Sequence, residues 1–469
     1  MTPPADLLTR DHAAVWHPCS QMHDYRAFEP MEVVAAQGLH LELADGRRLM
    51  DGISSWWCKS LGHRHPTITD ALKRQADTFE HVILANTTSE ATVRLCERVL
   101  ALANRGGTHF TKVFFTDNGS TGVEVALKMA LQAQAQRGRT RRTGLACLRN
   151  GYHGETAAAM SVSDLDLYNS PHGPLMVPTL KLDGLPYRSG PGDAAWQDAS
   201  AEWPGIEAQL QTQADTLAAV IVEPVLQCAG RMRCFSPDLL RRLRRWCDDH
   251  AVLLIADEIA AGCYRLGTPL AWHHACTGCT AASCARNAGA GCGILPDLAV
   301  LSKGLTAGYL PMAVVLATEP LYQTFYGPYN DHIAFMHSNT YAGNALAVAV
   351  AHAALDVYGQ TDIAGNVERV GGHLAARFAA LPDVASVYAD PRGVGMAAAI
   401  DLRHPDGTTL DPTRRTGYAV YREATRRGAL LRPLGDTMYL FPPLNITEDE
   451  VDALVAVLTE SVAAVLGAG

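Results

Sequence analysis

The chain has 469 residues, of which 48% are hydrophobic and 19% charged, with a formal net charge of −9. This is the composition of a globular protein, and its acidic balance argues against a nucleic-acid partner, which requires a basic face. No apolar run approaches the ~20 residues of a membrane span, and the N-terminus lacks the apolar core of a signal peptide. We therefore expect a cytoplasmic protein with reduced thiols that binds neither nucleic acid nor membrane.

The middle of the chain alternates short apolar segments with longer amphipathic ones. Strands are predicted at 112–116, 217–224, 251–258 and 297–304, and helices at 121–137 and 237–250. The strands are β-branched and nearly continuous in hydrophobicity, as in sheets covered on both faces. The alternation predicts a mostly parallel sheet with helices on both sides.

The last hundred-odd residues follow another pattern. Residues 379–402 predict two or three strands, 413–428 a helix that ends at Gly428, 430–447 a strand pair around a turn, and 447–466 a helix capped by Thr447. We expect a large domain over 71–345 and a small α+β domain over 346–469, with residues 1–70 belonging to the small domain.

Polar residues follow several predicted strands, at the edge of an open α/β sheet where ligands bind. Asp257 ends one strand, Lys303 follows another, and Gly119 and Ser120 begin a helix. Each has an ordinary structural interpretation: an ion pair, a solvated loop amine and helix capping. Together they fit pyridoxal phosphate, which needs a lysine for its aldehyde, an acid at its ring nitrogen, a phosphate cup and a stacking partner. NGYHGET (150–156) offers that partner in Tyr152.

Nine stretches resemble the class III, fold-type I aminotransferases over nearly the whole chain. They are VWHP (15–18), DGISSWW (51–57), TDNGSTGVEVALKMALQ (116–132), RNGYHGET (149–156), IVEPVLQ (221–227), LLIADEIA (253–260), LSKGLTAGYLP (301–311), MHSNTYAGN (336–344) and LRPLGDTMYLFPP (431–443). The resemblance implies the fold of those enzymes, which is a large domain with a mostly parallel seven-stranded sheet and a small α+β domain. It also implies pyridoxal phosphate as cofactor, a homodimer, and small-molecule amine and keto substrates.

The resemblance assigns roles to individual residues. Lys303, Asp257 and Tyr152 are the implied catalytic residues, and Lys303 binds the cofactor's aldehyde and then moves protons. The implied cofactor-binding residues are Gly119, Ser120, Tyr152, His153, Glu223, Asp257, Lys303 and, from the partner subunit, Thr340. The implied substrate-binding residues are Trp56, Arg265, Arg432 and Tyr439, with Arg432 holding a carboxylate.

Within the family, the chain resembles the branch that converts 8-amino-7-oxononanoate to 7,8-diaminononanoate in biotin biosynthesis. The amino donor implied is S-adenosylmethionine, or lysine as in some relatives. Cys19 stands where that branch usually has an aromatic residue, and a thiol cannot replace its stacking area. A broad ω-amine or diamine transaminase is therefore the alternative.

Residues 274–293 form a Gly- and Ala-rich insertion absent from the enzymes that the chain resembles. Cys276, Cys279, Cys284 and Cys292 lie within it in a C-x2-C-x4-C-x7-C pattern. Four thiolates suit an iron–sulfur cluster or zinc, and the uneven spacing favours the cluster. The alternatives are a flexible loop with unliganded thiols or two disulfides, and, more remotely, a metal-binding regulatory protein on an aminotransferase scaffold.

Overall fold

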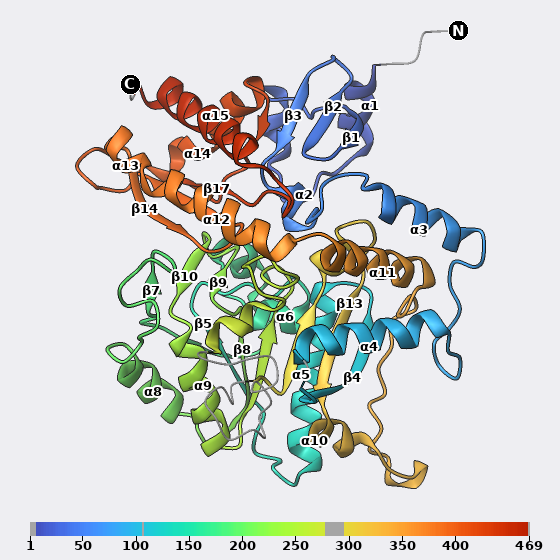
Figure 1. Ribbon diagram of the computed structural model, residues 1–469. Helices are drawn as coiled ribbons and strands as arrows, with labels where there is room; N and C mark the ends of the chain where they lie inside the picture. Colours follow the sequence, from blue (N-terminus) through green and yellow to red (C-terminus); the bar gives the residue numbers. More distant parts are fainter. Residues whose placement is uncertain (1–5, 106, 277–294, 468–469) are drawn as a thin grey trace.

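The computed structural model describes residues 6–105, 107–276 and 295–467. A seven-stranded sheet forms the centre of the larger, lower part of the molecule (Figure 1). Its strand order is β4-β13-β12-β11-β8-β5-β6, and only β13 runs antiparallel to its neighbours. The strands are β4 (Phe110–Thr116), β5 (Gly144–Leu148), β6 (Leu180–Leu182), β8 (Leu217–Val222), β11 (Leu253–Asp257), β12 (Leu298–Leu301) and β13 (Ala313–Thr318). The predicted α/β fold with a mostly parallel sheet is confirmed.

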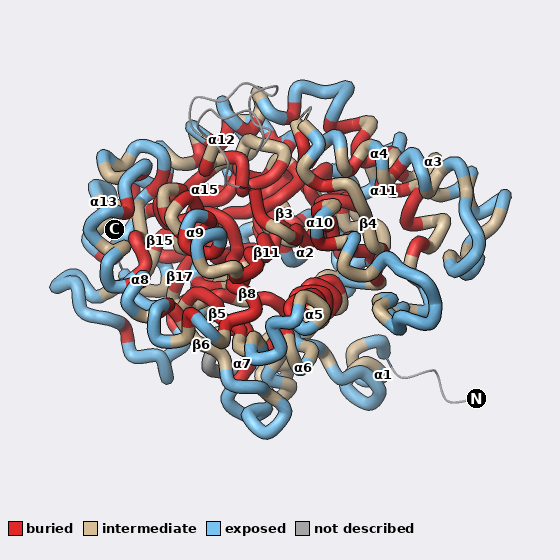
Figure 2. Tube along the Cα trace, turned by 90° about the horizontal axis from the view of Figure 1, so that it is seen from below, coloured by how far each residue is buried: buried red, intermediate tan, exposed pale blue. Residues whose placement is uncertain are grey.

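Alternate residues of the strands pack into two hydrophobic layers, one on each face of the sheet. In β11, Leu253 and Ile255 pack in the layer that contains helix α5 (Gly119–Gln136). Leu254 and Ala256 pack on the opposite face, in the layer that contains α9 (Asp238–Asp249). Burial on both faces explains why these strands read as continuous apolar runs, and Figure 2 shows β8 and β11 among buried segments.

The C-terminal part forms a second unit with the N-terminal segment, in the upper half of Figure 1. Its first sheet has the order β1-β2-β3-β16 and its second β14-β15-β17. The strands are β1 (Val33–Gln37), β2 (His40–Leu43), β3 (Arg48–Asp51), β14 (Tyr388–Gly393), β15 (Ala398–Leu402), β16 (Ala429–Leu430) and β17 (Thr437–Leu440). The helices include α12 (Ile363–Ala379), α14 (Thr416–Arg426) and α15 (Glu448–Leu466). The predicted Thr447 cap is present, because its side chain accepts a hydrogen bond from the Glu450 amide.

The prediction of a strand pair around a turn at 430–447 was wrong. β16 pairs in parallel with β3, whereas β17 pairs with β15, so the two strands lie in different sheets. Local sequence shows two strand-like runs around Gly435, but it does not contain the competing partner, which lies almost 400 residues earlier.

The remaining helices and strands surround the sheets of the two units. They are α1 (Leu7–Ala14), α3 (Pro66–Ala76), α4 (Glu90–Asn104), α6 (Ala157–Ser161), α7 (Asp166–Asn169), α8 (Trp203–Gln211), α10 (Glu319–Tyr322), α11 (Ala345–Gln360), α13 (Leu381–Val384), and a small sheet of β7 (Tyr187–Arg188), β9 (Leu226–Gln227) and β10 (Arg233–Phe235). α11 packs against α3 and α4, whereas α12 packs against β14, β15 and α15. We propose that the two units divide between α11 and α12, slightly after the boundary predicted at 345. Among the described residues, no helix is long and apolar enough to span a membrane.

Candidate active site

A cavity of about 340 Å³ lies where the central strands end. Four connections line it: Asn118–Ser120 after β4, Glu223 after β8, Asp257 at the end of β11, and Lys303 after β12. β8, β11 and β12 are consecutive in the sheet, β4 is separated from β12 by β13 alone, and all four strands run in the same direction. The polar residues predicted to gather at this edge do so.

Asp257 is the buried acid of this cavity. Its Oδ2 lies 2.7 Å from Nδ1 of His153, and the two residues are 4% and 2% exposed. Its Oδ1 accepts a hydrogen bond from the Ile259 amide at 3.1 Å. The other ring nitrogen of His153, Nε2, is buried and has no partner among the described residues. Such a carboxylate is held in place on one side and can accept a further proton-bearing group on the other.

Glu223 is buried beside Asp257 and positions the loop that carries Tyr152. Its Oε2 accepts the Tyr152 amide at 2.9 Å and its Oε1 the Cys228 amide at 3.1 Å. Burial raises the pKa of Glu223 to about 7. The nearby His153 and the hydrogen bonds from the two amides act in the opposite direction, but burial has the larger effect. Glu223 therefore contributes to the site through the backbone that it holds.

Lys303 is the amine of this cavity, and its backbone is strained. Its φ is +37°, a left-handed value that residues other than glycine rarely adopt, and it lies two residues after the end of the buried strand β12. Its Nζ lies 4.8 Å from the ring centroid of Trp57, within cation–π range. The Lys303 amine therefore lies in the cavity and faces the ring of Trp57.

The N-terminus of α5 forms the other end of the cavity. Asn118 caps this helix by accepting the Thr121 amide at 3.1 Å, which leaves Gly119 and Ser120 facing the cavity. Gly154 approaches so closely that a β-carbon there would lie 2.3 Å from Ser120 Oγ. Tyr152 lies on the same side, with its hydroxyl donating to Glu155 at 3.0 Å. Exposed amides, a hydroxyl and the positive end of a helix dipole suit a phosphate.

Four consecutive residues without glycine form a left-handed turn beside this cavity. The turn is α2 (Ser54–Trp57), and its φ values lie between +44° and +70°. Left-handed residues with side chains cost of order 1–3 kcal/mol each, so the surroundings must hold them. The fully buried Asp51 does so: its Oδ1 accepts the Ser55 amide at 3.0 Å, and its Oδ2 accepts Ser55 Oγ at 2.6 Å and lies 2.8 Å from His63 Nε2.

The turn separates its two tryptophans between two cavities. Trp57 lines the first, and its Nε1 donates to the hydroxyl of the buried Tyr439 at 3.1 Å. Trp56 lines a second cavity of about 590 Å³ together with Tyr439 and Arg432. The Arg432 guanidinium lies 5.0 Å from the Trp56 ring centroid and donates to the Cys19 carbonyl. A cation and aromatic faces suit an elongated molecule with a carboxylate at one end.

The family profile described as "Aminotransferase class-III" matches residues 22–462. The chain belongs to the class-III aminotransferases. It is 38% identical over 466 residues, 98% of this chain and 82% of the relative, to the adenosylmethionine-8-amino-7-oxononanoate aminotransferase of Nitratidesulfovibrio vulgaris. A solved structure of the enzyme of that name from Methanocaldococcus jannaschii has 27% identity and a TM-score of 0.86, covering 98% of this chain and 99% of its own. An amine transaminase from an uncultivated Pseudomonas species in the PLP-bound form has 31% identity and a TM-score of 0.85, covering 96% and 99%. The predicted family, fold type and pyridoxal-phosphate-dependent transaminase activity are confirmed.

The side chains of this class-III aminotransferase fit pyridoxal phosphate. Asp257 supplies a buried acid for the ring nitrogen, Lys303 an amine for the aldehyde, and the start of α5 a phosphate cup. A β-carbon on Gly119 would come within 3.0 Å of Ile259, so the glycine keeps the space at the helix start open. The family thereby explains why weak individual signals occur together.

Not every predicted site residue lines a cavity. Arg265 is 2% exposed, donates to the carbonyls of Met396 and Pro442, and packs 3.9 Å from the Phe441 ring centroid. In this position it ties the large unit to the C-terminal unit, and burial lowers its pKa to about 9. Thr340 is exposed on this chain and is not among the residues that line the first cavity, so its role in a partner's phosphate cup stays a prediction.

The proposed metal site falls almost wholly outside the described residues. Cys276 is partly buried at the end of the turn Ala271–Ala275, whereas Cys279, Cys284 and Cys292 are not among the residues described. Within residues 6–105, 107–276 and 295–467, no group of three or more His, Cys, Asp or Glu side chains is placed to hold a metal ion. The iron–sulfur or zinc cofactor therefore has no structural support.

Reasoning from the sequence missed three residues with a place in the site. Trp57 faces Lys303, Asp51 holds the left-handed turn, and Tyr168 lines the second cavity. DGISSWW contains the first two, but a left-handed turn without glycine leaves no signal in a local pattern, and Tyr168 reaches the cavity only through the fold.

Proposed function

We propose that this aminotransferase converts 8-amino-7-oxononanoate to 7,8-diaminononanoate in biotin biosynthesis, with S-adenosylmethionine or lysine as amino donor. The observation that carries the proposal is the second cavity, where Arg432 lies over Trp56, one residue from the tryptophan that faces Lys303. A nine-carbon keto acid can place its ketone near Lys303 and its carboxylate at Arg432. The names of the relatives in Nitratidesulfovibrio vulgaris and Methanocaldococcus jannaschii support the same substrate.

Pyridoxal phosphate, when bound, supplies an aldehyde that condenses with amines and a ring that takes up negative charge. The Lys303 amine is placed to remove and return the proton at the reacting substrate carbon, since it enters the cavity where the ring binds. Asp257, oriented by His153, holds a proton at the ring nitrogen. The start of α5 anchors the phosphate, and Trp57 shields Lys303 from water on one side.

The proposed enzyme is a homodimer. Ile83, Met336 and Tyr341 are 64%, 89% and 62% exposed on this chain, and the Tyr341 ring lies 5.4 Å from that of His81. Exposed apolar patches of this kind mark interfaces. Thr340 adjoins this patch, which agrees with its delivery to the partner's phosphate cup. Light scattering of the holoenzyme should give twice the chain mass; a monomer would contradict the proposal.

The experiment that tests the reaction is a donor panel with 8-amino-7-oxononanoate as acceptor. S-adenosylmethionine, lysine and simple amines are compared for production of 7,8-diaminononanoate. Turnover with either of the first two supports the proposal. Turnover of simple amines with other ketones, without the oxononanoate, would instead establish the ω-amine transaminase alternative, which the similarity to the Pseudomonas amine transaminase favours.

The cysteine insertion remains a proposal that rests on the spacing of Cys276, Cys279, Cys284 and Cys292 alone. Iron, sulfide and zinc are measured in anaerobically purified protein, together with its visible spectrum. About one cluster or one zinc per chain supports the site. Absence of iron and zinc, with the four thiols titratable, would reject it.

A further inference from the structure

A second arginine, Arg231, reaches the cavity that holds Arg432. It lies in the tight turn between β9 and β10, with φ of +65°, and Met232 after it has φ of +52°. This left-handed conformation is easy for glycine and unfavourable for a residue with a β-carbon. Because the backbone conformation disfavours arginine here, we expect the Arg231 side chain to have a role of its own.

The C-terminal unit fixes this turn. The buried Arg392 donates from Nη2 to the Arg231 carbonyl at 2.6 Å and from Nε to the Met232 carbonyl at 3.2 Å. Its own charge is balanced by Asp401 at 2.8 Å. Because the backbone of Arg231 is held from outside, the start of its side chain has a defined direction.

The side chain of Arg231 reaches the segment that carries Arg432. Both arginines line the cavity of about 590 Å³ and also the adjoining cavity of about 570 Å³. Nη2 of Arg231 lies 3.8 Å from where a β-carbon on Gly435 would be, three residues after Arg432. Among the described residues, the nearest charge that acts on the Arg231 side chain is Asp401, whose pKa it helps to lower. Asp401 is itself paired with Arg392 at 2.8 Å and accepts the Thr437 hydroxyl at 2.7 Å.

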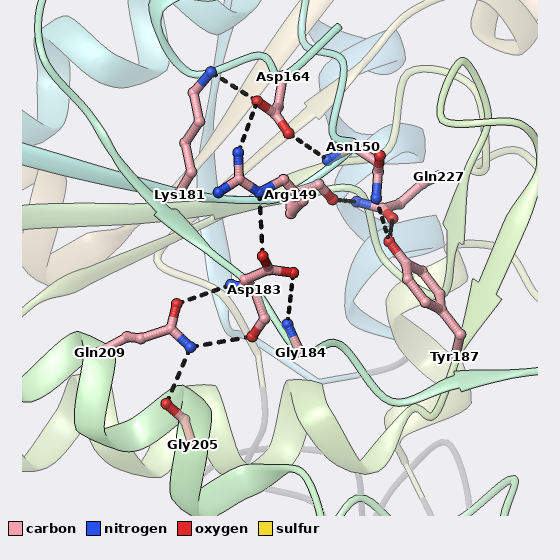
Figure 3. Close-up of polar contacts among 10 residues, drawn as sticks. All are labelled: Arg149, Asn150, Asp164, Lys181, Asp183, Gly184, Tyr187, Gly205, Gln209 and Gln227. Carbon is pink, nitrogen blue, oxygen red and sulfur yellow. Dashed lines mark hydrogen bonds and ion pairs between the residues drawn. The ribbon is translucent and has the colours of Figure 1, made fainter.

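The nearby carboxylates are engaged elsewhere. Asp164, which lines the same cavity, accepts Lys181 Nζ at 2.8 Å and the Asn150 amide at 3.0 Å (Figure 3). In the adjoining cavity, Asp24 pairs with Arg415 at 2.7 Å, and Asp436 accepts the Gly417 amide at 2.8 Å. Two guanidinium groups therefore face one cavity without a committed counter-ion, and an anion between them would relieve their repulsion.

We infer that Arg231 and Arg432 together bind one substrate carboxylate, so that Arg231 is a second determinant of specificity for a carboxylate-bearing substrate. This inference rests on the proposed function for the identity of that substrate. The carboxylate belongs either to the keto acid or to the amino-acid moiety of the donor, and both present the same group. The two sources differ in which KM depends on Arg231.

The first test is the binding of nonanoate to the holoenzyme by calorimetry, with nonanamide as the uncharged comparison. Arg231→Gly should weaken nonanoate binding about tenfold to a hundredfold, as expected for a charge-assisted hydrogen bond. It should leave nonanamide binding unchanged, and Arg231→Lys should retain part of the affinity. Because glycine suits φ of +65°, the variant should melt no lower than the wild type, which separates lost binding from lost folding.

Arg415→Gly is the matched control. Arg415 is also left-handed, with φ of +49°, but lines only the adjoining cavity and is paired with Asp24. We expect its nonanoate affinity to stay within about twofold of wild type, as for a charge at a distance in water. An equal loss in both variants would show a general charge effect and overturn the inference. So would equal nonanoate affinities of Arg231→Gly and wild type, or no nonanoate binding by the wild type.

The second test is kinetic. In Arg231→Gly, the KM of the substrate that binds there should rise about tenfold or more while kcat changes little, because the contact is remote from the reacting atoms. A raised KM for 8-amino-7-oxononanoate identifies the keto acid, and a raised KM for S-adenosylmethionine or lysine the donor; neither raised would overturn the inference. If wild type does not turn over the oxononanoate, the proposed function fails, and the nonanoate result still decides the role of Arg231.

Discussion

The two cavities of this aminotransferase are built in opposite ways. The cofactor cavity of about 340 Å³ is formed mainly by the ends of strands in one sheet, and its acids, Asp257 and Glu223, are buried. The second cavity, of about 590 Å³ and proposed to bind the substrate, draws on three parts of the chain: Trp56 of the N-terminal segment, Tyr168 and Arg231 of the large unit, and Arg432 of the C-terminal unit. The first cavity therefore depends mainly on one sheet, whereas the second depends on how three parts of the chain pack together.

The left-handed turn Ser54–Trp57 joins the two cavities. Trp57 faces Lys303 on the cofactor side, and Trp56 faces Arg432 on the substrate side. Adjacent side chains on such a turn point in different directions, so two residues can serve two cavities. Asp51, which holds the turn, therefore affects both.

The largest expected effect is on the cofactor side. Lys303→Ala should lower turnover roughly 10³-fold or more, because it removes both the amine for the aldehyde and the base. The aldehyde-linked absorbance band of the holoenzyme should also disappear, which a visible spectrum measures. Lys73→Ala, on the exposed face of α3, is the control and should retain activity. Retained turnover in Lys303→Ala would refute the assignment of the active site.

The next effect concerns the turn between the cavities. Asp51→Ala leaves the Ser55 amide and hydroxyl and His63 without their acceptor, and should lower the free energy of unfolding by about 3–5 kcal/mol. Urea unfolding of the cofactor-free protein measures this. Asp45→Ala breaks a solvent-exposed pair with Arg47 and should cost far less than Asp51→Ala. Equal costs in the two variants would show that Asp51 does not hold the turn.

A smaller effect is expected on the substrate side. Arg432→Ala should raise the KM for 8-amino-7-oxononanoate about tenfold to a hundredfold with a modest change in kcat. Arg432→Lys should fall between, since an ammonium keeps the charge but loses the two-pronged geometry. Steady-state kinetics at saturating donor measures both. An unchanged KM in Arg432→Ala would place the carboxylate elsewhere.

The smallest effect is a difference in how Glu223 and Asp164, one from each cavity, make the free energy of unfolding depend on pH. Burial raises the pKa of Glu223 from 4.5 to about 7, so the folded chain binds more protons than the unfolded chain between these values. Its contribution to stability is present below about pH 4.5 and is lost as the pH rises to about 7. Glu223→Gln should therefore reduce the fall in unfolding free energy between pH 5 and pH 7, by up to about 1.4 kcal/mol per pH unit.

Asp164→Asn is the comparison on the substrate side. Burial alone would raise the pKa of Asp164, but hydrogen bonds from Lys181 and the Asn150 amide outweigh it and lower the pKa below its ordinary 3.8. Its stabilising contribution is lost only as the pH falls below that value, so the slope between pH 5 and pH 7 should match wild type. Equal slopes in wild type and Glu223→Gln, measured by urea unfolding at each pH, would contradict the prediction.

The cofactor side could be predicted from the sequence because each of its residues adjoins a strongly apolar strand. Asp257 is the last residue of β11 and Lys303 lies two residues after β12, so placing the strands placed these residues. Arg432 was found through its resemblance to family members. Arg265, expected in the substrate site, instead holds carbonyls of the C-terminal unit, since its neighbours in space come from residues 396 and 442.

By itself, the sequence determined the family and the cofactor through its motifs, and the mostly parallel sheet and the candidate residues at its edge through local runs of hydrophobicity. Only the tertiary structure decided that β16 pairs with β3, that Ser54–Trp57 turns left-handed around Asp51, and that Arg231 meets Arg432. The strand pairing and the meeting of the two arginines join residues from about 200 to almost 400 positions apart, which local sequence does not specify. The left-handed turn is held by the nearby Asp51, but its backbone strain leaves no periodic pattern in the chain.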